Sequence, residues 1–232
     1  MNFRLVFVLF YFTLFFTSCQ KDSDSNVNQL IDPTGSVNKG RDNVQDNKQI
    51  GTPCRNGYAG KNPCNGYDLL AHIDLYSFES TNGNDSWGWT DPDTKKEYVL
   101  MGLDDGTAFV DISEPTKPIL IGKLPTETEV SPWRDIKVHN NHAYIVSEAA
   151  DHGVQVFDLT RLRKAEAKQN FTADRVLKTV PTAHNIAINP DSGYGYVLGT
   201  NRNDEFFGGV HFLDLNDPNS IRFVGGYGKG GY

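Results

Sequence analysis

The chain has 232 residues, a length that suits one or two globular domains. Its formal net charge is −7 and it has no run of Lys and Arg, which excludes the basic surface that nucleic-acid binding requires. Aromatic residues make up 12% of the chain, and there are 22 Gly and 11 Pro, a composition typical of short strands joined by tight turns.

Residues 1–18 resemble a bacterial lipoprotein signal peptide. Arg4 precedes an apolar run, Leu5 to Phe16, that is shorter than the ~20 residues of a membrane-spanning helix. Small residues stand directly before Cys19, which predicts cleavage there and lipidation of Cys19; ordinary cleavage with an incidental cysteine is the alternative. We therefore expect an exported protein, lipid-anchored to the bacterial outer membrane. The Lys and acidic residues of Gln20–Asp24 are similar to a surface-export tag, although any solvated tether could have this composition.

Residues 19–50 are rich in Asn, Asp, Ser, Gln and Lys and show no apolar periodicity, which predicts a flexible tether. Cys54 and Cys64 follow, and the export signal places them where thiols pair. We expect a disulfide between them. A metal or redox site is the alternative, but one cysteine pair without a nearby His fits neither pattern.

One short stretch occurs three times, each time as Gly, four residues, Asp and an aliphatic residue. The three copies end at Asp111, Asp158 and Asp214, and each follows a β-rich run that begins at a tyrosine: Tyr98, Tyr144 and Tyr196. With four short antiparallel strands per repeat, this period predicts an all-β fold of β-propeller blades. The expected repeat domain covers 51–232, with blades at about 85–125, 131–180 and 181–228.

The second repeat shows the strand pattern most clearly. Strands are expected at 133–138, 143–147 and 153–159, and Thr160–Lys168 favours a short helix in the link that follows. The three repeated aspartates each stand just before a turn, where a carboxylate accepts backbone N–H groups. A residue repeated once per blade is expected to belong to the scaffold, so we interpret these aspartates as turn anchors and not as catalytic residues.

Residues 67–78 resemble a further outer strand, of the kind that an N-terminus donates to close a propeller ring and cover its edges. Propellers typically have four to eight blades, and three repeats are present. The expectation is therefore an incomplete ring, in which the sequence is a fragment of a longer protein or several chains complete one ring.

The run from Cys54 to Tyr232 resembles the choice-of-anchor B family, bacterial surface proteins with LVIVD-type propeller repeats. The matching segments are Asp68-Leu-Leu, Asn84-Asp-Ser-Trp-Gly-Trp-Thr-Asp, Gly106-Thr-Ala-Phe-Val-Asp-Ile-Ser, Trp133-Arg-Asp-Ile-Lys-Val, Ala149-Ala-Asp-His-Gly-Val-Gln-Val-Phe-Asp-Leu and Ala183-His-Asn-Ile. The resemblance implies a propeller held at the cell surface. It implies no particular reaction.

Equivalent positions at the entrance of each innermost strand are expected to converge at the mouth of the central channel. The candidate binding residues there are Asp85, Trp87, Arg134, Asp135, His184 and Asn185. Such convergent polar groups are the default binding site, and Arg134 would grip an anionic ligand. The alternative is that they cap strand ends and bond between blades. Glu148 and His152 could join the site, although a solvated loop is expected there, and His211 is expected to be packed in the core.

The sequence favours a binding module for an extracellular protein or glycan over an enzyme. No nucleophile elbow, nucleotide loop or zinc-protease motif is present in the sequence. No cofactor is predicted, although Asp, His and Asn could hold a divalent cation. The alternative is a secreted hydrolase or lyase, with or without a bound metal, that uses Asp135, Arg134 and His184 at the channel mouth.

Overall fold

A computed structural model of the chain describes residues 51–165 and 168–229. Contacts within the chain divide it into two units, Met1–Lys48 and Gln49–Tyr232. The expected signal peptide, Cys19 and the tether lie outside the described residues. Within the described ranges, no helix is long and apolar enough to cross a membrane.

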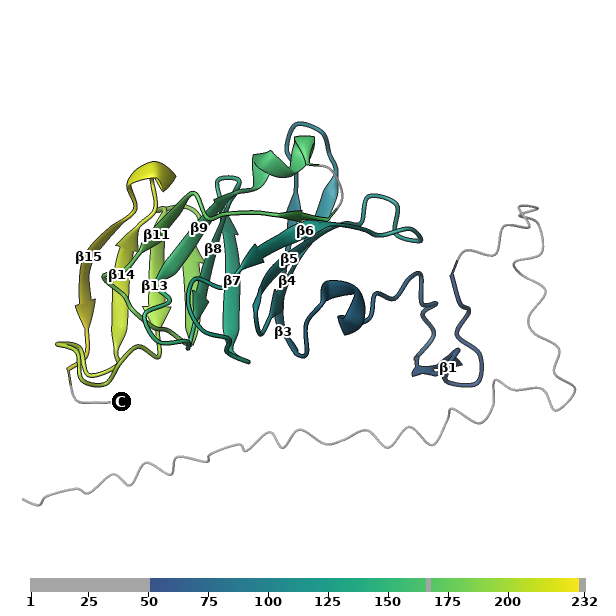
Figure 1. Cartoon of the computed structure of the whole chain (residues 1–232), viewed down its shortest axis with the longest axis horizontal. Coiled ribbons are helices and arrows are strands. Elements are labelled where there is room, and N and C mark those ends of the chain that lie inside the picture. Colours follow the sequence, from purple (N-terminus) through teal and green to yellow (C-terminus); the bar gives the residue numbers. More distant parts are fainter. Residues whose placement is uncertain (1–50, 166–167, 230–232) are drawn as a thin grey trace, which may run out of the picture. The chain divides into compact units, whose positions relative to one another are not determined.

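The described part is all-β, and three of its four sheets correspond to the three sequence repeats (Figure 1). The first repeat sheet contains β3 (Gly83–Thr90), β4 (Glu97–Leu103), β5 (Gly106–Asp111) and β6 (Ile119–Pro125). The second contains β7 (Arg134–His139), β8 (His142–Ser147), β9 (Val154–Asp158) and β11 (Arg175–Leu177). The third contains β12 (Asn185–Asn189), β13 (Tyr194–Leu198), β14 (Val210–Asp214) and β15 (Arg222–Tyr227). Four antiparallel strands per repeat are therefore confirmed, and none of these sheets is closed on itself.

The link after β9 connects the first two repeat sheets. It begins as a 3-10 helix, η3 (Leu159–Lys164), and then β10 (Gln169–Asn170) pairs in parallel with β6 as a fifth strand of the first sheet. A side chain at Gly122 would lie 2.2 Å from the Gln169 carbonyl oxygen, so only glycine permits this approach. Arg163 of η3 donates two hydrogen bonds to the buried Asp91 carboxylate, which fixes the link to the first sheet.

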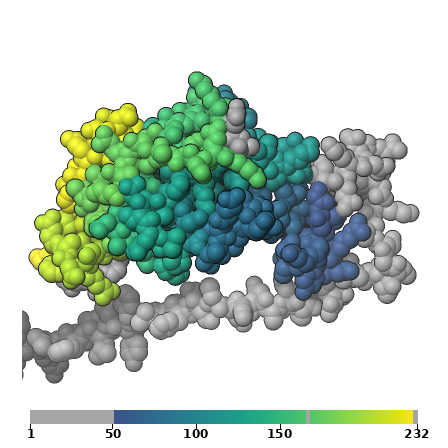
Figure 2. All heavy atoms as spheres, viewed as in Figure 1, coloured from purple at the N-terminus to yellow at the C-terminus, as the bar shows by residue number. Residues whose placement is uncertain are grey.

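Two apolar layers hold the repeat sheets face to face. The first layer joins the first and second sheets and includes stacked Phe109 and Phe157, whose ring centroids lie 4.6 Å apart. The second layer joins the second and third sheets through residues such as Tyr144 and Leu213. The second sheet is therefore covered on both faces. In the space-filling view, the yellow-green third sheet lies at one end of the packed repeat sheets (Figure 2).

The three repeated aspartates are turn anchors, as expected. The backbone N–H groups of Ser113, Thr160 and Asn216 donate to Asp111, Asp158 and Asp214 over 2.9, 2.9 and 3.1 Å. The three tyrosines, in contrast, are not equivalent. Tyr98 lies opposite the repeated aspartate Asp111 in its ladder. Tyr144 and Tyr196 instead lie opposite Val156 and Phe212, which come two residues before the repeated aspartates of their own strands.

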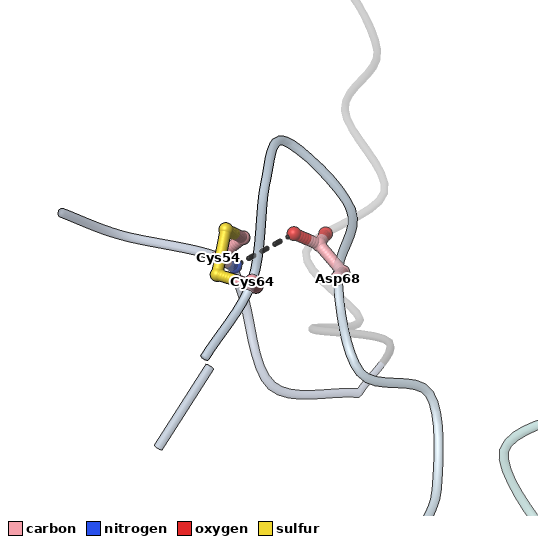
Figure 3. Close-up of a disulfide and its surroundings, with 3 residues drawn as sticks. All are labelled: Cys54, Cys64 and Asp68. Atoms are coloured by element: carbon pink, nitrogen blue, oxygen red, sulfur yellow. Dashed lines mark hydrogen bonds between the residues drawn. A yellow bond between two sulfur atoms is a disulfide. The ribbon is translucent and has the colours of Figure 1, made fainter. Parts of the chain in front are cut away.

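The residues before the first repeat form a small disulfide-linked loop. Cys54 and Cys64 are bonded, with their Cα atoms 5.9 Å apart, around the two-residue strands β1 (Tyr58–Ala59) and β2 (Asn62–Pro63). The Asp68 carboxylate accepts the Cys54 N–H over 2.8 Å, as Figure 3 shows. The expected disulfide is therefore present.

Residues 67–78 form no strand in this chain, which corrects the local expectation. Leu69 makes an isolated bridge with Thr52, and Leu75–Phe78 form the 3-10 helix η2, which begins where the Asp74 carboxylate accepts the Ser77 N–H. A strand needs a partner edge for its backbone groups, and in the described part this segment pairs only at Leu69. Closure of a ring by this segment stays a prediction.

The turn-anchor role predicts different costs for two substitutions of the buried Asp111. Asp111→Ala removes the acceptor for the Ser113 N–H and is expected to lower the free energy of unfolding by about 1–2 kcal/mol. Asp111→Asn keeps an acceptor oxygen and loses only the ion pair with the exposed Lys96, so it should cost clearly less. Urea unfolding followed by tryptophan fluorescence measures both. Equal losses for Ala and Asn would contradict the role.

Candidate functional site

A small hollow of ≈ 250 Å³ lies beside β7 and β12, at the ends where these inner strands begin. It is lined by Asn84, Asp85, Trp133, Arg134, Asp135, His184 and Asn185. Five of the six predicted residues are therefore brought together. The sixth, Trp87, is not among the lining residues, but Lys137 joins it to them: the Lys137 ammonium lies 4.5 Å from the Trp87 ring centroid and binds Asp135.

The carboxylates of this hollow connect neighbouring sheets. The Ile136 N–H donates to Asp85 over 2.9 Å, and the Ile186 N–H donates to Asp135 over 2.7 Å. Asp85, Asp135 and Asn185 thus occupy one repeat position, 50 residues apart, and the first two each accept an amide of the next inner strand. Asn84 does the same for the Arg134 N–H. Both aspartates therefore form hydrogen bonds between neighbouring repeats, which is the role that the sequence offered as the alternative to ligand binding.

The two aspartates differ in their titration because their partners differ. Burial raises the pKa of Asp85, and its contact with Asp135 raises it further. Burial also acts to raise the pKa of Asp135, but hydrogen bonds from Lys137 and the Ile186 amide outweigh it and hold that pKa below its usual value. Asp135 therefore loses its proton at a lower pH than Asp85 does, and it forms an ion pair with Lys137.

The Arg134 guanidinium points into the protein and is occupied there. Nε donates to the Leu103 carbonyl over 3.0 Å, Nη2 donates to Thr126 Oγ1 over 2.9 Å, and Nη1 lies 3.0 Å from His152 Nε2. The side chain is 1% exposed. Burial lowers the pKa of Arg134 to about 10, so the group remains protonated at neutral pH. We assign its side chain to packing between the first two sheets, because all three guanidinium nitrogens contact protein groups and the buried group is not open to an anionic ligand.

His152 is fully buried, which corrects the expectation of a solvated loop residue. Its Nδ1 lies 2.9 Å from the Gly153 carbonyl oxygen and therefore carries the proton, so Nε2 accepts from Arg134. Burial lowers the pKa of His152 to about 4, and the Arg134 charge adds to this effect. The sequence could not show this, because the partners are 18 residues apart and meet through the fold.

The exposed part of the site is aromatic and polar. Trp133 is 49% exposed and its ring centroid lies 6.0 Å from that of His184, which is hydrogen-bonded to Glu148. Glu148 therefore adjoins the predicted site residue His184. The exposed Asn185 has no hydrogen-bond partner for its side chain among the described residues. Trp133 is the functional candidate that sequence reasoning missed, although its place beside Arg134 was visible.

Other polar residues of the described part are engaged in structure. His211 is buried as expected, 3.3 Å from Asp204 and in edge contact with Phe206. Asp204 also accepts the Phe206 N–H, so it anchors its own loop. Among the described residues, no group of three or more His, Cys, Asp or Glu side chains could hold a metal ion.

No protein-family model matches the chain, and no curated protein is significantly similar to it.

The buried His152 predicts a pH dependence of stability. The unfolded state takes up a proton near pH 6.5, whereas the folded state resists it down to about pH 4, so unfolding becomes easier as the pH falls through this window. The full effect is up to about 3 kcal/mol. His152→Gln should flatten this part of the pH curve of the unfolding free energy, with the same change at the exposed His72 as the control. A curve unchanged in His152→Gln would refute the assignment.

Proposed function

We propose that the chain is a surface-anchored β-propeller segment that binds an extracellular glycan at the hollow between its inner strands, without catalysis. The three repeat sheets, stacked face to face with inner strands side by side, are consistent with consecutive propeller blades. The proposed anchor at Cys19 and the likeness to the choice-of-anchor B family add the cell-surface location to this proposal.

The exposed Trp133 carries the glycan proposal. A tryptophan half open to solvent beside a polar hollow offers a flat apolar face for the C–H face of a sugar ring. Asn84, Asp85, His184 and Asn185 supply donors and acceptors at the same hollow for hydroxyl groups. An apolar platform with a few directed polar groups is the usual form of a small-molecule site.

The charges at the hollow favour a neutral ligand. Lys137 is bound to Asp135, and the Arg134 guanidinium is used inside the protein, so neither offers a free cation to a sulfate or carboxylate. A neutral polyhydroxyl chain brings no charged group of its own into the hollow, so no ion has to lose its water without gaining a charged partner.

A hydrolase is the second candidate, because the environments of Asp85 and Asp135 shift their two pKa values in opposite directions. Two carboxyl groups whose pKa values are shifted apart are typical of the general acid and the general base of a hydrolase. Against it, each carboxylate already accepts a backbone amide of the next strand. These bonds favour a scaffold role for the pair and thus a binding site.

Glycan-array binding of the full chain tests this function. Trp133→Ala should weaken binding to any recognised neutral glycan about tenfold or more, since exposed Trp residues dominate such contacts. The matched control is Tyr227→Ala, which removes an exposed aromatic ring away from the hollow and should bind normally. Glycan hydrolysis by the wild type, lost in Asp135→Asn with binding retained, would establish the hydrolase instead. If the chain binds proteins but no glycan, the proposal of a glycan ligand is wrong.

A further inference from the structure

The two contacts between repeat sheets use the same positions, which defines a forward face and a back face for each sheet. On the forward face, Leu100 and Phe109 of the first sheet are the register equivalents of Tyr144 and Val156 of the second. All four are buried, with exposures of 0 or 1%, against the next sheet. Each contact also includes one carboxylate that accepts an inner-strand amide, from Asp85 or Asp135.

The forward face of the third sheet has the same form but is not covered. The equivalents there are Tyr196 and Phe212, which pair across β13 and β14, and both are partly exposed. Leu198, the equivalent of the fully buried Val146, is also partly exposed. Asn185 stands where Asp135 accepts an amide, and its side chain has no partner in the described part of the chain.

The back face of the first sheet is also incompletely covered. Val99 and Met101 are partly exposed, whereas their equivalents Ala143 and Ile145 in the second sheet are fully buried. Residues 70–78 reach this face and bury Phe78, but an apolar hollow of ≈ 410 Å³ remains between that segment and the sheet.

We propose that a second copy of this chain docks head to tail, with its first-sheet back face on the third-sheet forward face. This contact would continue the stacking that already joins the sheets, with Asn185 as the acceptor for an amide of the incoming inner strand. The two faces lie on opposite end sheets of one molecule, so the contact is heterologous and builds a ring or an open row. Apolar faces of this kind are rarely left open to water in a stable monomer.

Sedimentation and light scattering of the full chain in mild detergent test the proposal. The wild type is expected to associate. Phe212→Asp on the forward face and Val99→Asp on the back face should each weaken association about tenfold or more, because a charge would be buried in the contact. Val130→Asp, on an exposed loop, is the matched control and should associate normally. Circular dichroism and thermal melting check folding, and Tyr196→Asp replaces Phe212→Asp if that variant unfolds.

Mixing the two face variants gives the decisive result. A forward-face variant keeps an intact back face, so Phe212→Asp and Val99→Asp chains carrying different tags should bind each other, although neither binds itself. A monomeric wild type at high concentration, association that persists in both single variants, or no recovery on mixing would each overturn the proposal. Association that persists in both single variants would mean that the chains associate through the detergent or an acyl anchor and not through these two faces.

Discussion

The hydrogen bond from one inner strand to a carboxylate of the preceding inner strand sets the arrangement of the described domain. Asp85 accepts the Ile136 amide and Asp135 accepts the Ile186 amide, so successive sheets are held in one register. Directional bonds of this kind fix an angle and an offset, which apolar packing alone leaves adjustable. The large apolar layers on both sides of the second sheet then supply most of the stabilisation.

The same bonds determine what the hollow can do. Carboxylates that are engaged with backbone amides and Lys137 are well positioned but have little freedom for proton transfer. Arg134 and His152 form a second set of contacts inside the protein. There the buried Arg134 guanidinium is bonded to a carbonyl, a hydroxyl and a neutral imidazole. The groups that remain open to solvent are Trp133, His184 and the amide side chains of Asn84 and Asn185. This is why the proposed function is recognition of a neutral ligand.

Repetition also explains the proposed self-association. A repeat sheet has two apolar faces, and each needs a neighbour. The second sheet has both, whereas the third sheet and the first sheet each show residues partly exposed at positions that are buried elsewhere. Because the equivalent contacts are already visible inside the molecule, the chemistry of the expected partner surface is defined by the chain itself.

The sequence alone predicted the repeat period, the four antiparallel strands of each repeat, the turn role of Asp111, Asp158 and Asp214, and the Cys54–Cys64 pair. These features depend on local spacing and alternation, which a sequence displays directly. It also placed Asp135 and Asn185 at equivalent positions, with Asp85 in the corresponding segment of the first repeat. The folded chain was needed to show that residues 67–78 make no strand, that Tyr98 is two residues out of register with Tyr144 and Tyr196, and that β10 pairs with the first sheet. It alone showed that Arg134 points inward to His152. Those outcomes depend on which partner a backbone group or a buried charge finds across the fold, and sequence spacing carries no record of that choice.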